Sequence, residues 1–171
     1  MRRLTFALLA GALAVGIVAA PAAAKQPDPG MNIVKTAIAV NSSGPYAGAF
    51  DTLITLVVKL DLAGALSQRG QLTVFAPTDA AFAAIGITPA NADAVIAALG
   101  RDTVTDIVLY HVAKGSRDAS EVLGSSKIRM LNGDFAKVNG SAGTIDGAPI
   151  IVTNVYASNG IIHAVGAVLL P

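Results

Sequence analysis

The chain closes with SNGIIHAVGAVLLP (residues 158–171), and this segment decides the fold. It contains no charged residue, and His163 is its only side chain that titrates near neutral pH. Because side chains alternate between the two faces of a strand, Ile161, His163 and Val165 are predicted to share one face. The histidine therefore lies among aliphatic side chains, and its role is either chemical or structural.

The other histidine of the chain, His111, ends a second apolar run, DIVLYH (residues 106–111). This run is predicted to be helical. On a helix, His111 shares one face with Val104, Ile107 and Val108. Both histidines are thus predicted to point inward.

Neither histidine has the neighbours that a metal or catalytic site requires. A zinc site needs a second histidine one helical turn away, or clustered carboxylates. Asp106 is the only acid close to His111, and no acid lies within fifteen residues of His163. The G-x-S-x-G elbow of a serine hydrolase is absent. A lone histidine on an apolar face is more often a core residue with its ring nitrogens bonded to backbone groups, and we interpret both in this way.

The first residues, MRRLTFALLAGALAVGIVAAPAAAKQ, have the order of a secretory signal peptide. Two arginines precede an apolar run, small residues follow, and the best cleavage position is after Ala24. The alternative is an uncut anchor, since the run nearly reaches the length of a membrane span. Residues 25–30 are predicted to be a flexible leader, and residues 31–171 a single domain.

Composition limits the classes of partner. Cleavage after Ala24 leaves 147 residues with ten basic and eleven acidic side chains, a net charge of about −1. This balance gives no attraction to nucleic acid or to an anionic membrane. Cysteine is absent, which excludes disulfides and a lipid-modified N-terminal cysteine. Beyond the signal, no apolar run is long enough to span a bilayer.

The order of helical and strand patterns predicts an α+β fold. Strands are expected at residues 72–76 and 148–156, and Asn132-Gly133 predicts a hairpin. Thr78 is expected to cap a short helix with Asp79 in its first turn. Further helices are expected at residues 32–40, 50–62, 90–99 and 101–112, the last capped by Asp102.

Three segments together resemble the fasciclin-like domain family. They are LTVFAPTDAAF (residues 72–82), VLYHV (residues 108–112) and NGIIHAVGAVLLP (residues 159–171). NIVKTAIAV (residues 32–40) also fits the first helix of that family, so the resemblance covers residues 31–171.

The resemblance implies a helical N-terminal half packed against a wedge of short strands. It also implies a secreted or surface-attached role in adhesion and protein binding, with no catalysis, no metal and no cofactor. In this family the signature segments are neighbours in the core. The structural motif residues would therefore be Thr78, Asp79, His111, Asn159, Gly160 and His163.

The binding residues of the fasciclin-like family are matched less completely in this sequence than its structural motifs. In animal relatives, integrin binding is attributed to an acidic-apolar pair before the closing Asn-Gly, but Asn154-Val155 stands here and lacks the acid. The tyrosine-histidine segment is intact. Core packing is its favoured interpretation, and binding through Tyr110, Leu109 and Val112 is the alternative. Tyr110 is one position round from the buried stripe and is expected to be partly exposed.

Three basic residues of the predicted hairpin, Lys127, Arg129 and Lys137, form either a small positive patch or an ordinary solvated face.

The functional hypothesis is a non-enzymatic exported adhesion or binding module for a protein, cell-surface or matrix component. The first alternative is a cell-envelope protein that binds a small apolar ligand in a closed cavity. The second is a hydrolase with His111 or His163 as general base, which needs a ring nitrogen open to solvent.

Overall fold

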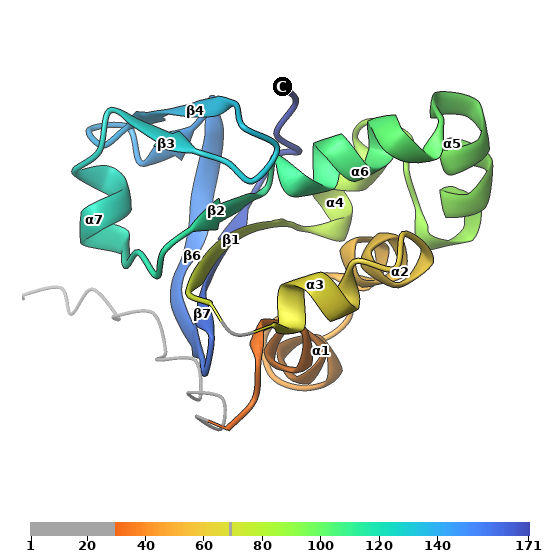
Figure 1. The fold of residues 1–171 in the computed structure, drawn as a ribbon, viewed down its shortest axis with the longest axis horizontal. Helices are drawn as coiled ribbons and strands as arrows, with labels where there is room; N and C mark the ends of the chain where they lie inside the picture. The colour runs from red at the N-terminus through yellow and green to blue at the C-terminus, as the bar shows by residue number, and fades with distance from the viewer. Residues whose placement is uncertain (1–29, 69) are drawn as a thin grey trace, which may run out of the picture.

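The computed structural model describes residues 30–68 and 70–171, in which most helices gather on one side, and the strands, with one short helix beside them, on the other (Figure 1). The helices are α1 (Ile33–Ser42), α2 (Asp51–Lys59), α3 (Ala63–Ser67), α4 (Asp79–Ala83), η1 (Pro89–Asn91), α5 (Ala92–Leu99), α6 (Arg101–Leu109) and α7 (Ala119–Leu123). The strands are β1 (Leu72–Pro77), β2 (Val112–Lys114), β3 (Lys127–Arg129), β4 (Phe135–Asn139), β5 (Thr144–Ile145), β6 (Ala148–Ala157) and β7 (Gly160–Val165). The predicted α+β class is confirmed.

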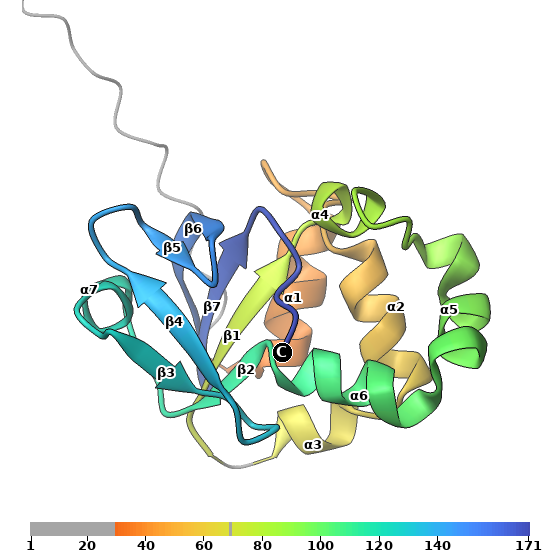
Figure 2. The ribbon, with the colours of Figure 1, turned by 90° about the horizontal axis from the view of Figure 1, so that it is seen from above.

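The seven strands form one sheet in the order β2-β1-β7-β6-β5-β4-β3. β1 and β7 pair in parallel, and the other neighbouring strands are antiparallel. An isolated bridge between Ala113 and Met130 joins the β2 end of the sheet to the segment after β3. The N–H of Leu131 also donates to the carbonyl of Val112 at 2.7 Å. The sheet therefore curls back on itself (Figure 2), which covers edges that would otherwise be free to pair.

Two apolar cores lie on opposite sides of β1 and β7. Ile162 and Ala164 of β7 pack into the core shared with helices α1, α2 and α6, whereas Val165 packs into the core enclosed by the curled sheet. Every residue of β7 is buried, because β1 and β6 flank both of its edges and an apolar core covers each of its faces. The closing segment thus supplies an interior strand of the sheet, with neighbours on both edges.

Several predicted boundaries are corrected. The helix expected at residues 50–62 ends at Lys59, and Asp61 takes a left-handed φ of 59° before α3 begins. The helix that contains Asp106 ends at Leu109, and Gly100 is its N-cap, so Asp102 lies in the first turn and does not cap it. β2 and α7 were not predicted. The Asn132-Gly133 hairpin is confirmed as the β3–β4 pair.

No helix in residues 30–68 and 70–171 is long and apolar enough to cross a membrane. The signal peptide and most of the leader were predicted for residues 1–29, which lie outside the described residues.

Candidate functional site

His163 is fully buried, and backbone groups occupy both of its ring nitrogens. Nε2 lies 2.9 Å from the carbonyl oxygen of Arg117, and Nδ1 accepts from the N–H of Asn154 at 3.3 Å. The ring also stacks on Phe75, with 5.7 Å between centroids. These partners require the neutral tautomer with its proton on Nε2, and burial lowers the pKa of His163.

His111 lies just beyond the C-cap of α6 and carries its proton on the opposite nitrogen. Nδ1 donates to the carbonyl of Ile107 at 2.8 Å, and Nε2 accepts from the N–H of Leu169 at 2.9 Å. Burial lowers the pKa of His111 to about 4. His111 therefore links the end of α6 to the C-terminal tail, and neither ring nitrogen is open to solvent.

Asn159 joins the closing segment to the helical layer. Its Oδ1 accepts from the N–H of Ile33 at 2.7 Å, and its Nδ2 donates to the carbonyl of Leu66 at 2.9 Å. Gly160 follows with a φ of 154°, and a Cβ there would overlap the carbonyl oxygen of Leu72. This tight turn places β7 directly beside β1.

Thr78 and Asp79 connect two helix starts. The hydroxyl of Thr78 accepts from the N–H of Ala81, which caps α4. The carboxylate of Asp79 accepts from the N–H groups of Asp51 and Thr52 at 3.1 and 2.8 Å. It therefore binds the first turn of α2, where the helix dipole favours negative charge.

Five of the six motif residues thus connect elements of the fold through their side-chain hydrogen bonds, and Gly160 does so through its close approach to Leu72. Within residues 30–68 and 70–171, no cluster of three or more His, Asp or Glu side chains is placed to hold a metal ion. Asn154, which stands where the acidic-apolar pair of animal relatives is missing from this sequence, uses its Oδ1 to accept from the N–H of Ala119 at 2.8 Å.

The expectation that Tyr110 is partly exposed is wrong. Its side chain is only 4% exposed, because α6 ends at Leu109 and the chain turns into β2 beneath the β3–β4 hairpin. The hydroxyl donates to Oδ2 of Asp146 at 2.6 Å and lies 3.4 Å from the carbonyl oxygen of Phe135. Burial, with the Asp146 carboxylate beside it, raises the pKa of Tyr110. Val112 is also buried, and Leu109 is half-buried.

Above Tyr110, the outer face of the β3–β4 hairpin carries four exposed side chains, the hairpin patch: Lys127, Arg129, Phe135 and Lys137. The ladder register sets Lys127 opposite Lys137 and Arg129 opposite Phe135. Nζ of Lys127 lies 4.7 Å from the centroid of the Phe135 ring. The basic residues were identified from the sequence, whereas the aromatic residue joins them only through the register.

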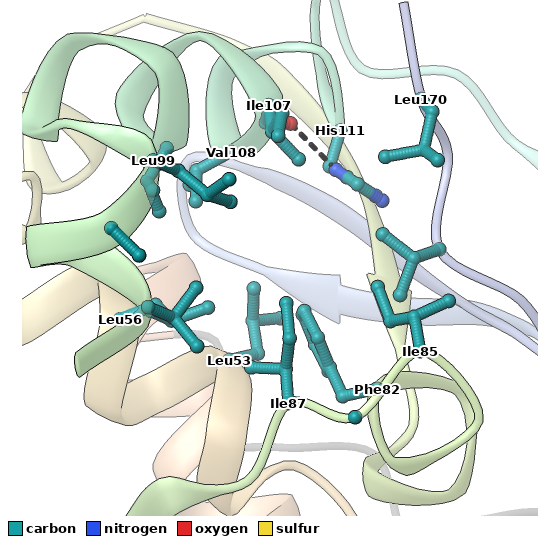
Figure 3. A pocket seen from close by; sticks show the side chains of 15 residues that line it. Leu53, Leu56, Phe82, Ile85, Ile87, Leu99, Ile107, Val108, His111 and Leu170 are labelled. Atoms are coloured by element: carbon teal, nitrogen blue, oxygen red, sulfur yellow. Dashed lines mark hydrogen bonds between the residues drawn. The ribbon is translucent and has the colours of Figure 1, made fainter. Parts of the chain in front are cut away.

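An apolar pocket of about 330 Å³ lies at the opposite end of the molecule, among α2, α4, α5, α6 and the C-terminal tail. Figure 3 shows its walls, which include Leu53, Phe82, Ile85, Leu99, Val108 and Leu170. His111 also lines it. The sequence suggested an apolar ligand site as an alternative but did not locate this pocket, because each of its residues is an ordinary apolar side chain and five segments must come together to form it.

Comparison with known proteins gives consistent matches. The profile of the fasciclin domain family matches residues 48–171. Protein sll1483 of Synechocystis sp. is 38% identical over 125 residues, which cover 71% of this chain and 67% of that protein. Transforming growth factor-beta-induced protein ig-h3 of Sus scrofa is 28% identical over 125 residues, which cover 71% of this chain and 18% of that protein.

The similar solved structures include a FAS1 domain pair from the insect cell adhesion molecule Fasciclin I. The TM-score is 0.43 and the sequence identity 16%. The match covers 79% of this chain and 44% of that chain, so this chain spans less than half of the domain pair.

Proposed function

This chain belongs to the fasciclin domain family, and we propose that it is an exported, non-enzymatic adhesion module that binds an acidic protein segment through the hairpin patch. Fasciclin domains occur in adhesion proteins and mediate protein interactions, and members of the family are generally non-enzymatic. The hydrolase alternative has no support in the geometry, because backbone groups hold both ring nitrogens of His111 and of His163.

The observation that carries the proposal is the arrangement of charge on the hairpin. Like charges directly opposite each other across a ladder destabilise a sheet. Even so, Lys127 and Lys137 face each other, with Arg129 on the same face. Within the described residues, these three cations form no ion pair. A partner carboxylate would relieve this repulsion.

The carboxylates nearest to the patch are already engaged. Asp146 accepts from the hydroxyl of Tyr110 and, at 2.7 Å, from the backbone N–H of Lys137. Asp134 accepts from the side-chain amide of Asn132 at 3.0 Å. Nε of Arg129 donates to the carbonyl of Gly133 at 3.3 Å, and Nζ of Lys127 lies over the ring of Phe135. All three cations are nevertheless exposed, and in residues 30–68 and 70–171 none has a carboxylate partner, so they can bind an external anion while Phe135 beside them offers an apolar contact. Arginine and aromatic side chains together are typical of the residues that dominate protein interfaces.

Tyr110 is a positioning residue in this proposal. Its hydroxyl supports the hairpin from below through Asp146 and Phe135. The tyrosine-histidine segment thus contributes to binding by holding the patch in place, and of the three candidate residues only Leu109 has an appreciably accessible side chain.

The test uses the chain from Lys25 to Pro171 and an immobilised synthetic peptide that alternates glutamate with leucine. We expect the triple variant Lys127→Gln/Arg129→Gln/Lys137→Gln to bind about tenfold or more weakly. The matched control, Lys35→Gln/Arg101→Gln/Lys114→Gln, removes three exposed cations elsewhere and leaves binding unchanged. If both variants lost binding to the peptide equally, net charge alone would explain the loss, and the proposal would be contradicted.

Export is the second part of the proposal. Homologues with this domain are secreted or extracellular, and the sequence predicts cleavage after Ala24. Mass spectrometry of the protein collected outside the cytoplasm should find a mature N-terminus at or near Lys25. An intact Met1 on a membrane-bound form would instead show an uncut anchor.

A further inference from the structure

The apolar pocket has the dimensions of a small-molecule site and does not overlap the hairpin patch. Its volume of about 330 Å³ is within the usual range for ligand pockets. It is roughly twice the size of an engineered apolar cavity of about 150 Å³ that stays dry and binds benzene. The walls come from five separate segments, and their side chains face a common space (Figure 3).

The lining determines what kind of molecule fits. None of the fifteen lining residues is charged, and His111 is the only one with a titratable side chain. Both of its ring nitrogens are bonded, to Ile107 and Leu169, so the imidazole offers a ligand no free donor or acceptor. A buried charge or polar group on the ligand would therefore be left unpaired, which is costly.

From this lining we infer that the pocket binds a small, uncharged, hydrocarbon-rich molecule of about two or three rings, or a medium-length aliphatic chain. The mouth supports the same ligand class. Ile85, Leu99 and Leu170 line the pocket and are 47%, 50% and 56% exposed. A bound apolar molecule would remove part of this surface from water, which favours binding.

The C-terminal tail forms one wall of the site. Leu170 and Val168 line the pocket, and the N–H of Leu169 between them donates to His111. The hydrogen bond of His111 therefore fixes the wall, and the site is preorganised for its ligand.

The probe is N-phenyl-1-naphthylamine, an uncharged aromatic amine whose fluorescence rises in apolar surroundings. We expect saturable binding to one site on the chain from Lys25 to Pro171. Ala98→Phe fills the pocket from α5 and should weaken binding about tenfold or more. Ala97→Phe places the same ring at the neighbouring exposed position of α5, which does not line the pocket, and should leave binding unchanged.

Competition tests the ligand class: 1-decanol should displace the probe at lower concentration than decanoate, because no cation in the lining can pair with a carboxylate. Absence of saturable binding to the wild type, or equal effects of the two phenylalanine variants, would overturn the inference. So would binding that appears only as the protein self-associates, because the occupant would then be a second copy. The hairpin triple variant should keep full probe binding, so this result is independent of the proposed protein contact.

Discussion

Replacement of His163 separates a structural histidine from a catalytic or metal-binding one. His163→Ala removes a fully buried ring that stacks on Phe75. It also leaves the carbonyl of Arg117 and the N–H of Asn154 without their partner. Three replacements of different shape and polarity distinguish these losses: alanine, leucine and glutamine.

The magnitude follows from the two losses. Truncation of a large buried side chain to alanine costs about 2–5 kcal/mol, and each buried polar group left unpaired costs about 1–3 kcal/mol. The bond to Asn154 is long at 3.3 Å, so its loss lies at the lower end of that range. We expect about 4–6 kcal/mol for alanine and about 2–3 kcal/mol for leucine, which refills volume but bonds neither group. Glutamine should lose less than leucine, because its amide can donate to the carbonyl of Arg117.

Urea unfolding of the three variants and the wild type, followed by circular dichroism, gives the free energies of unfolding. Val165→Ala, on the same buried strand but without a side-chain hydrogen bond, is the packing control. A leucine variant as stable as the wild type, or more stable than the glutamine variant, would refute the hydrogen-bonding role. Midpoints that do not change in any variant would show that His163 does not hold the fold together.

Three further predictions address the other structural contacts. The pKa of His111 is lowered from 6.5 to about 4. The contribution of the neutral His111 ring to the free energy of unfolding is therefore complete above pH 6.5 and is lost as the pH falls toward 4. Urea midpoints measured from pH 7 to pH 4 should show a loss of about 3 kcal/mol from this group, and the His111→Gln variant a shallower dependence; equal slopes would contradict this. Gly160→Ala should cost more than about 3 kcal/mol through the overlap with Leu72, whereas Gly64→Ala, in open space on α3, should be neutral or stabilising by thermal melts. Asp79→Ala should cost about 1–2 kcal/mol by removing the acceptor at the start of α2, and an unchanged urea midpoint would count against that contact.

Strand β7 shows how far local sequence patterns can lead. Alternation was sufficient to place His163 and Val165 on one face, because the period of a strand is fixed. The complete burial of the strand depends on its parallel pairing with β1. In the sequence, β1 lies more than eighty residues earlier, and no local pattern specifies that pairing.

Tyr110 shows where helical periodicity fails. The prediction of partial exposure assumed that the helix continues through residue 112, but α6 ends at Leu109. Beyond that point the direction of the Tyr110 side chain depends on tertiary contacts with Phe135 and Asp146. The position of the apolar pocket could not be predicted for the same physical reason. Its shape depends on how several helices and the C-terminal tail are placed relative to one another, and no single segment specifies that placement.

Long-range nitrogen NMR of the two imidazole rings tests most directly the central claim, that both histidines are neutral structural groups. At about pH 6, the account predicts a single proton on each ring, on Nε2 of His163 and on Nδ1 of His111, so that both imidazoles are neutral. Added zinc should leave both spectra unchanged. Titration of either ring near the ordinary histidine pKa of about 6.5, or a shift of its nitrogen signals on addition of zinc, would contradict the account.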